Sequence, residues 1–299
     1  RTEGRLNAGE EKTWNKANSH EDDTARPGSS CLIGMEERLV EIEILKTQGR
    51  EVLKILCDAT ILFDTIDPQI LAGKLEEQGY GKRKPCHTLI THLAPRVFKV
   101  KGHLGEFTEA CGRSILAGCI KSLSLARAYT NAEVDAIREL DLNEPLETGE
   151  FEHLKGKPQG HWVKQHVDDL TIIIWSTSQE NLGECGASIA KKWYEAMEKL
   201  KLIVSEKTKI IPNCDAARTV QQALREQGLE VDIEDAWVDL GVDTAVGKRS
   251  QVKLDKRGRE ATTRCKHAGY IINQDKTKRS KVLATAGCVP AYAYGSTAI

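Results

Sequence analysis

The chain has 299 residues, of which 40 % are hydrophobic and 29 % charged, and its mean hydropathy is -0.42. This composition is typical of a globular protein with a buried core and excludes a disordered or fibrous chain. The net charge of -1 by itself argues against nucleic-acid binding. The longest uncharged apolar run, Leu170–Trp175, is far shorter than the roughly 20 residues of a membrane span, and the polar first 26 residues predict no signal peptide.

The first elements are predicted from spacing and caps. Residues 1–27 are polar and charged, which predicts a disordered lead-in. Apolar residues three or four apart predict an amphipathic helix over Cys31–Lys46, and Glu51–Cys57 predicts a short strand. Asp67-Pro68 combines an N-cap acid with proline at the first helical position, so a helix should begin there and end at Gly79.

The middle of the chain alternates between the two kinds of element. Basic and apolar residues alternate over Arg96–Lys101, which predicts a strand or ribbon closed by Gly102. Ile115–Tyr129 has a helical pattern, and a second, acidic helix is expected after Asn131.

A hairpin and a long helix are expected next. The strand-like runs His161–Val167 and Leu170–Trp175 flank Asp168-Asp169, which predicts a hairpin with the two carboxylates at its turn. Gln179–Leu200 predicts a long helix, and Thr208–Ile211 a strand ended by proline.

The last third predicts a helix over Ala216–Gln227, a strand over Trp237–Val242 and then a basic stretch. Lys248–Lys281 carries 12 Lys and Arg against 3 Asp and Glu, a net charge of +9. Such a stretch is either a solvated helix face or a surface for a polyanion. Strands and helices mixed without a regular βαβ rhythm favour the α+β class.

Nine cysteines are spread singly, with no C-x2-C pair, so the usual zinc spacings are missing. An odd number in a chain of this size indicates free thiols in a reducing, intracellular compartment. Nucleus and cytoplasm are not distinguished by this criterion, and no membrane partner is expected.

Carboxylates at strand ends are the strongest chemical signal. Asp168-Asp169 is expected at a tight turn, where two acids repel each other unless a cation is present, although a turn also uses Asp for its backbone tolerance. A second pair, Asp22-Asp23, lies in the lead-in and is assigned no role. Asp58 directly follows a predicted strand. Carboxylates on adjacent strand ends suit a two-metal site for phosphoryl transfer, with the ions about 4 Å apart.

Four segments in chain order resemble motifs A to D of a reverse-transcriptase palm. They are Asp58-x4-Phe63-Asp64, Leu116-Ala117-Gly118-Cys119-x-x-Ser122, Val167-Asp168-Asp169-Leu170 and Leu202-x5-Lys207-Thr208. More narrowly, the chain resembles the RNA-directed DNA polymerase domains of non-LTR retroelements, of the kind abundant in dinoflagellate genomes. The resemblance runs from about Gly28 to the C-terminus and indicates a truncated domain.

The resemblance implies a role for each motif residue. Asp58, Asp168 and Asp169 would be catalytic carboxylates that hold two Mg²⁺ or Mn²⁺ ions. Lys207 would bind the dNTP triphosphate and donate a proton to pyrophosphate. Two further residues would contact the dNTP: Phe63 beneath the sugar, excluding a 2′-hydroxyl, and Gly118 near the base pair. Without the resemblance, Phe63 is a core aromatic and Lys207 a surface lysine.

The implied architecture is a right-hand palm, an antiparallel sheet backed by helices, with partial fingers and a helical thumb. Fingers and palm would occupy residues 28–213, and residues 214–299 a truncated basic thumb. The basic stretch would bind the phosphates of an RNA or DNA template with its primer. The residues expected to do so are Lys248, Arg249, Lys256, Arg257, Arg259 and Arg264.

The implied reaction is RNA-directed DNA synthesis, in which a primer 3′-hydroxyl attacks the α-phosphate of a dNTP. The alternative is an inactive retroelement relic, or a nucleic-acid-binding scaffold that keeps the palm. Ala117 stands where motif B usually has Gln, His166 stands where motif C usually has an aromatic, and no fingers motif is recognised before Asp58. The missing fingers motif and the altered motif B favour the alternative.

Overall fold

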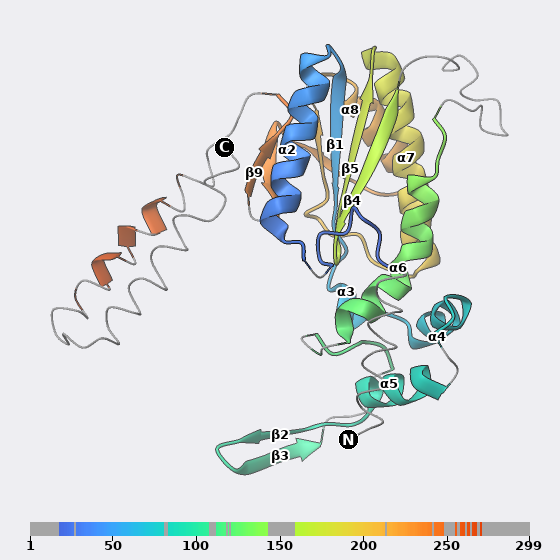
Figure 1. Ribbon diagram of the computed structural model, residues 1–299, viewed down its shortest axis with the longest axis vertical. Coiled ribbons are helices and arrows are strands. Elements are labelled where there is room, and N and C mark those ends of the chain that lie inside the picture. Colours follow the sequence, from blue (N-terminus) through green and yellow to red (C-terminus); the bar gives the residue numbers. More distant parts are fainter. Residues whose placement is uncertain are drawn as a thin grey trace.

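The structure is a computed structural model. It describes residues 18–26, 28–80, 83–107, 112–117, 119, 121–142, 159–212, 214–240 and 242–247, together with 255, 258–260, 262–263, 265–267 and 270. The described part combines an antiparallel-rich sheet with helices, so the expected α+β class is confirmed (Figure 1). None of its helices combines the length and the low charge needed to cross a membrane.

A five-stranded sheet in the order β4-β5-β1-β6-β7 forms the centre. All neighbours are antiparallel except β6 and β7, which are parallel and joined through helix α8. The strands are β1 Glu51–Cys57, β4 Gly160–His166, β5 Asp169–Ser176, β6 Lys209–Pro212 and β7 Asp232–Ile233.

Helices cover both faces of this sheet (Figure 1). On one face lie α6 (Ser122–Arg138), α7 (Gln179–Lys199) and α8 (Ala217–Glu226), which share the larger hydrophobic cluster with β1 and β5. The other face carries α2 (Cys31–Thr47) and a smaller cluster. Beside α2 lies a hairpin of β8 (Ala236–Asp239) and β9 (Val242–Ala245).

Strand β1 is buried on both sides, and its side chains alternate between the two clusters. Leu53, Ile55 and Cys57 join the α6–α8 side, whereas Val52 and Leu56 join the α2 side. The alternation explains why the strand has no polar face, and it directs the side chain of the residue after Cys57 toward the α2 side.

A smaller group of elements lies between β1 and α6 in the chain. It contains α3 (Leu62–Thr65), α4 (Pro68–Glu77) and α5 (Arg83–Leu93). A separate hairpin of β2 (Val97–Val100) and β3 (His103–Phe107) projects from it (Figure 1). Helix α4 begins as predicted, because Asp67 accepts hydrogen bonds from the backbone N–H groups of Gln69 and Ile70.

Two predicted elements differ from the structure. Residues 115–117 are not helical, and α6 runs from Ser122 through Asn131 as one helix, because its buried stripe continues to Val134 and Ile137. The strand expected over Trp237–Val242 is a hairpin that reverses at Leu240, where φ is 47°.

Residues 18–26 also differ from the expected disorder. The backbone of this lead-in pairs with β4, since Thr24 N donates to Gln165 O at 2.9 Å and Gln165 N donates to Asp22 O at 3.1 Å. Asp23 and Thr24 are buried, and a Cβ at Gly34 of α2 would collide with the Thr24 side chain. Residues 1–17 lie outside the described part.

Candidate active site

Asp58 is held at the end of β1 by the loop that precedes β6. Ser205 N donates to Asp58 O at 2.9 Å, and Asp58 N donates to Thr208 Oγ1 at 3.2 Å. Thr60 N donates to Ile203 O at 2.8 Å, two residues further on. Both backbone groups of Asp58 are therefore fixed by residues 203–208.

Asp169 lies opposite Asp58 on the neighbouring strand. The last ladder pair between β1 and β5 is Cys57–Leu170, so one further step of the antiparallel register places Asp58 against Asp169. Thr171, two residues along β5, bonds to groups on the α2 side of the sheet. Side chains alternate along a strand, so Asp169 shares that side with Asp58.

The surroundings of Asp169 contain more negative than positive charge. Burial raises the pKa of Asp169, and the nearby carboxylates of Asp168, Asp239 and Asp58 raise it further, to about 6, against an opposing effect of Arg38. A carboxyl group in such surroundings gains from a bound cation, because a cation replaces repulsion with attraction.

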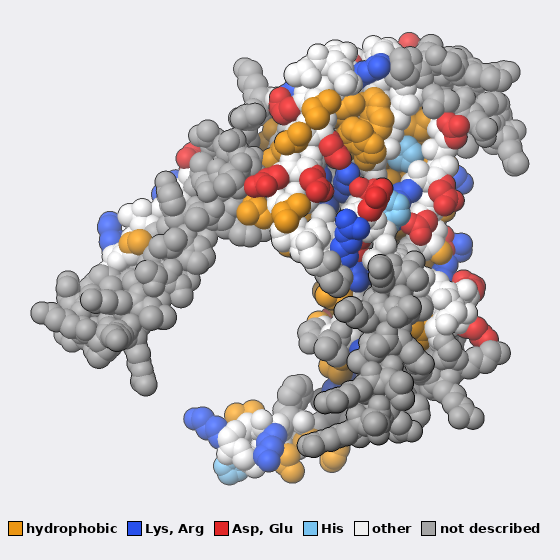
Figure 2. Space-filling model, in the orientation of Figure 1, with side chains coloured by type: hydrophobic (Ala, Val, Ile, Leu, Met, Phe, Trp, Pro, Cys, Tyr) orange, Lys and Arg blue, Asp and Glu red, His pale blue; other side chains and the backbone are white. Residues whose placement is uncertain are grey.

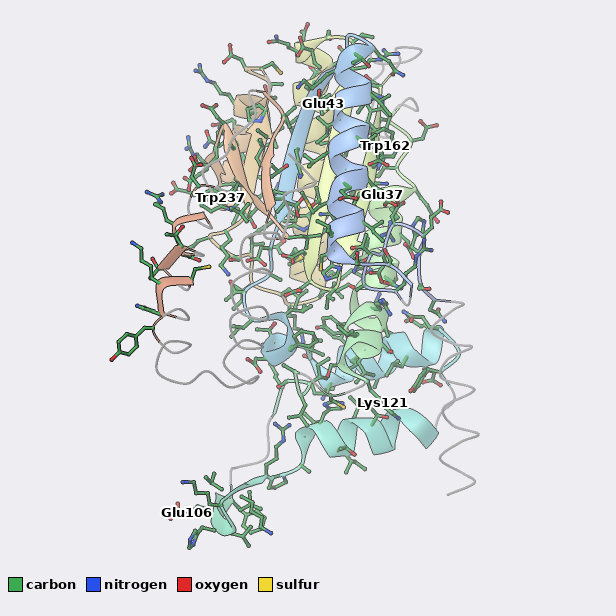
Figure 3. All side chains as sticks on the ribbon, turned by 60° about the vertical axis from the view of Figure 1, so that its left-hand side comes forward. Glu37, Glu43, Glu106, Lys121, Trp162 and Trp237 are labelled. Atoms are coloured by element: carbon green, nitrogen blue, oxygen red, sulfur yellow. The ribbon has the colours of Figure 1, made fainter. Side chains whose placement is uncertain are left out.

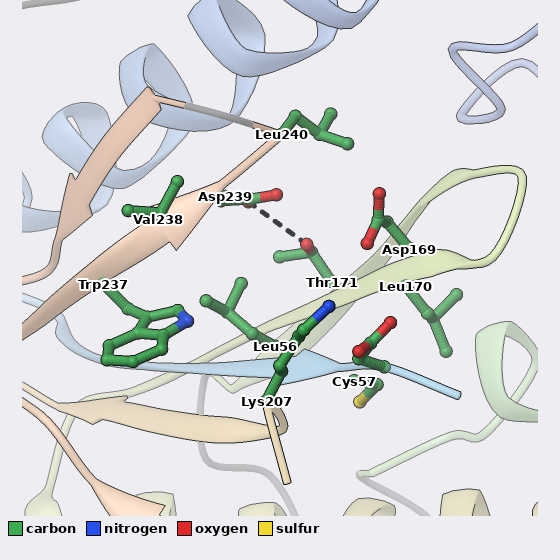
Figure 4. A pocket seen from close by; sticks show the side chains of 11 residues that line it. Leu56, Cys57, Asp169, Leu170, Thr171, Lys207, Trp237, Val238, Asp239 and Leu240 are labelled. Carbon is green, nitrogen blue, oxygen red and sulfur yellow. Dashed lines mark hydrogen bonds between the residues drawn. The ribbon is translucent and has the colours of Figure 1, made fainter. Parts of the chain in front are cut away.

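Asp58 and Asp169 line one cavity of about 120 Å³ together with Lys207 (Figure 4). The β8–β9 hairpin forms its opposite wall with Trp237, Val238, Asp239 and Leu240. Lys207 is exposed and belongs to the loop that holds Asp58. A cavity with two carboxylates and a flexible lysine ammonium group at its edge suits a metal-bound phosphate ester.

Asp168 points elsewhere. It lies in the β4–β5 turn beside Val167, whose φ is 60°, and lines a smaller cavity of about 40 Å³ on the α6–α7 side. Asp58 lines both cavities. The structure therefore brings Asp58 to both members of the Asp168-Asp169 pair, but the pair itself is divided between two cavities.

A buried network of charges adjoins Asp169, and the sequence analysis assigned it no role. The Asp239 carboxylate accepts from Arg38 Nη1 at 2.9 Å and from Lys54 Nζ at 2.7 Å. Thr171 Oγ1 donates to Asp239 at 3.2 Å, and Lys54 donates to Thr244 Oγ1 at 2.8 Å. We call these five residues the Asp239 network. It joins α2, β1, β5 and both strands of the β8–β9 hairpin.

Two cations surround one carboxylate in the Asp239 network, and the pKa values follow from that. Burial alone would raise the pKa of Asp239, but the charges of Lys54 and Arg38 lower it to about 2. Burial lowers the pKa of Lys54, against the attraction of Asp239. The Nε and Nη2 atoms of Arg38 are buried without a hydrogen-bond partner among the described residues, so this network has an excess of donors.

The lead-in acids are paired as well. Asp23 forms a buried ion pair with Arg127 of α6, and Asp22 accepts from Lys164 of β4 at 2.8 Å. Burial works to lower the pKa of Lys164, but its hydrogen bonds to Asp22 and Glu41 raise it overall. Asp22-Asp23, which was assigned no chemical role, thus has a structural one: the Asp23 side chain binds the lead-in to α6, and the Asp22 side chain binds it to β4.

His166 is held between the lead-in and α2. Its Nδ1 lies 2.9 Å from Thr24 Oγ1, and its Nε2 lies 3.0 Å from Cys31 Sγ. Burial lowers the pKa of His166. The imidazole that replaces the usual aromatic before the two aspartates thus serves as a polar junction between three segments.

The other predicted site residues are only partly described. Phe63 is partly buried against the larger hydrophobic cluster and lines neither cavity, so its role as a sugar gate stays a prediction. Arg259 is exposed on a helical segment. The remaining ones lie outside the described residues: Gly118, Lys248, Arg249, Lys256, Arg257 and Arg264.

A divalent cation fits the donor chemistry of this site. Among the described residues no group of three or more His, Cys, Asp or Glu side chains could hold a metal ion by itself. Asp58 with Asp169, or Asp58 with Asp168, offers two carboxylates. Mg²⁺ is usually held by one or two carboxylates plus substrate phosphates, so two protein ligands per ion suit an ion that arrives with a nucleotide.

No protein-family model matches this sequence, and no curated protein matches it. Among solved structures, telomerase from Candida albicans in complex with the TWJ fragment of telomeric RNA is similar over 80 % of this chain and 36 % of that chain, at 14 % identity and a TM-score of 0.46. Telomerase from Candida tropicalis with a TWJ fragment is similar over 83 % and 37 %, at 13 % identity and a TM-score of 0.49. Apo telomerase from Candida tropicalis is similar over 84 % and 40 %, at 13 % identity and a TM-score of 0.47. This chain thus spans well under half of each telomerase chain, and so distant a likeness carries no conclusion about function.

Proposed function

We propose that this chain is the palm region of an RNA-directed DNA polymerase of a retroelement. The observation that carries the proposal is the convergence of Asp58 with Asp168 and Asp169 from adjacent strands, where burial and mutual repulsion raise the pKa of Asp169 to about 6. A catalytic carboxylate pair that needs a cation explains why a fold keeps such repulsion.

The residues act by holding and orienting the reactants. Two Mg²⁺ or Mn²⁺ ions, when bound, would supply the charge neutralisation that nucleotidyl transfer requires. Asp58 and Asp169 would ligate from the larger cavity and Asp168 from the turn. Lys207, at the edge of that cavity, would bind the triphosphate and donate a proton to the leaving pyrophosphate. The basic residues from Lys248 onward would bind template and primer phosphates.

A second function is favoured by one observation. Ala117 stands where motif B usually has Gln. An inactive relic that retains the palm as a nucleic-acid-binding scaffold would show this departure.

Primer extension separates the two functions. The full chain is supplied with an RNA template, a DNA primer, dNTPs and Mg²⁺ or Mn²⁺. We expect extension, and we expect Asp58→Asn and Asp168→Asn each to reduce its rate by about a thousandfold or more, because each removes a carboxylate that acts on the transition-state charge. Asp215→Asn, at an exposed carboxylate before α8 and outside the four motifs, is the matched control and should keep the activity.

Absence of extension with both metals, together with retained template binding, would favour the scaffold. Equal extension by the Asp58 variant and the wild type would overturn the assignment of this site. A triple charge reversal at Lys248, Arg257 and Arg264 should weaken duplex binding and flatten its salt dependence without abolishing metal binding.

A further inference from the structure

The β2–β3 hairpin stands apart from the central sheet. Its two-residue turn uses Lys101 (φ 49°) and Gly102 (φ 89°), the positive-φ pair that a tight hairpin requires. Its strands pair through Val97–Phe107, Lys99–Leu104 and Val100–His103. No other described strand joins this two-stranded sheet, and it projects from the body in two views (Figures 1 and 3).

Apolar side chains of the hairpin are left in water. Val100 is 65 % exposed, Leu104 69 % and Phe107 77 %. Because paired residues share a face, Phe107 lies with Val97, and Val100 lies with His103. A folded chain gains nothing from holding an aromatic ring in water. Leu104 and Phe107 pair with Lys99 and Val97 on one face of the hairpin, and we read that face as a contact surface.

The tip of the same hairpin is basic. Lys99, Lys101 and His103 fall within five residues that include no acid, and all three side chains are exposed. Glu106 is the one acid between residues 97 and 107. Figure 2 shows the Lys and His side chains of this projection beside hydrophobic ones, at the far side of a wide gap from α2.

We propose that the β2–β3 hairpin binds single-stranded nucleic acid, with a base stacked on Phe107 and phosphates at Lys99 and Lys101. An exposed aromatic ring beside cations is the arrangement that non-specific single-strand binding uses. The positive tip matches a polyphosphate rather than an added protein strand. Naming that strand as the template rests on the proposed function; the binding itself does not.

The test is fluorescence anisotropy of a labelled oligothymidylate with the full chain in EDTA, over a range of salt concentrations. Phe107→Ala should bind roughly tenfold more weakly, because stacking of one base is lost. Phe107→Trp should keep the affinity, whereas Phe107→Leu, apolar but not aromatic, should lose it. Lys99→Glu with Lys101→Glu should weaken binding and lower the salt slope by about 0.7 for each phosphate that is no longer bound.

Matched controls lie on other exposed surfaces. Ile44→Ala on α2 removes an apolar side chain that is 49 % exposed, and Lys191→Glu with Lys192→Glu on α7 makes the same charge change. Both should bind as the wild type does. All hairpin variants should keep the wild-type melting temperature, since the mutated side chains are exposed.

Unchanged affinity in Phe107→Ala and in the double lysine variant would overturn the proposal. Equal affinity of Phe107→Leu and wild type would also overturn it, because binding would then not depend on an aromatic ring. Primer extension is measured on the same samples. If the wild type binds the oligonucleotide through the hairpin and yet never extends a primer, that result supports this inference and rejects the proposed function.

Discussion

Asp22-Asp23 and Asp168-Asp169 are the same dipeptide, and both adjoin strand β4, yet their surroundings differ in charge. Each lead-in acid has a cationic partner, Arg127 for Asp23 and, shared with Glu41, Lys164 for Asp22. The second pair lies beside Asp58, and the pKa of Asp169 rises to about 6 through burial and the repulsion of neighbouring carboxylates. Pairing stabilises the first dipeptide, whereas the second keeps its repulsion. The difference separates acids that stabilise the fold from acids that we propose to bind a cation.

Asp239 lines the same cavity as Asp169, but its pKa is lowered whereas that of Asp169 is raised. Asp239→Asn should destabilise the protein by about 3–5 kcal/mol, since it leaves the charges of Arg38 and Lys54 buried without a counter-charge. The measurement is urea unfolding at pH 7. Arg38→Met combined with Asp239→Asn is the control and should recover part of the loss.

The pH dependence of that stability has a definite sign. The pKa of Asp239 in the folded protein, about 2, is below the ordinary 3.8, so its contribution is present above about pH 4 and is lost as the pH falls through about 2. A variant that lacks Asp239 but unfolds in acid at the same pH as wild type would contradict this account.

Asp23→Asn tests the contribution of the Asp23–Arg127 ion pair to stability. We expect a loss of roughly 2–4 kcal/mol, because Arg127 of α6 is left buried and unpaired. Hydrogen exchange should rise at the amides of Thr24 and Gln165, which form the lead-in ladder. Asp22→Asn is the milder comparison, since Lys164 keeps Glu41 as a partner at 2.7 Å.

Asp169→Asn should do the reverse and stabilise the fold by on the order of 2 kcal/mol at about pH 8. The folded pKa of about 6 lies above the ordinary 3.8, so the wild-type contribution is fully present below about pH 4 and is lost as the pH rises through about 6. The free energy of unfolding of the variant should therefore change less between about pH 4 and about pH 6 than that of the wild type. Destabilisation at about pH 8 would mean that the Asp169 carboxylate is held by a cation. The control is Asp64→Asn, which should change little.

Mg²⁺ should stabilise the wild type by on the order of 1 kcal/mol at about ten times its dissociation constant. The effect should be larger at about pH 7.5 than at about pH 5, because a proton on Asp169 competes with the ion. Differential scanning fluorimetry of wild type and of Asp58→Asn with Asp169→Asn checks this. An equal Mg²⁺ shift in the double variant would place the ion elsewhere.

Local signals predicted most of the fold. β1 matches its predicted bounds, and α4 begins at the predicted cap, because an apolar run and an Asp-Pro start need no distant partner. The α6 continuation and the β8–β9 turn were missed, since a helix through Asn131 and the reversal at Leu240 depend on tertiary packing.

The motifs predicted that Asp58 and Asp169 end neighbouring strands, and the structure places them opposite each other. The buried Asp239 network was not predicted. Lys54 interrupts an apolar strand, and Arg38 lies on the buried stripe of α2 between Met35 and Ile42, so both were visible as departures from the pattern. Their common partner, Asp239, lies 201 residues from Arg38, and no periodicity joins such distant positions.

The lead-in also affects how one molecule can associate with another, because it covers part of a sheet edge. Strand β4 stands at the edge of the sheet, and residues 22–24 bond to its backbone at Gln165. At the opposite edge, β7 is only two residues long. A chain shortened past Arg26 would uncover the backbone N–H and C=O of Gln165, near the end of β4 that lies beside the two aspartates. Such an edge invites strand addition from a second molecule, so the lead-in doubles as a guard against aggregation.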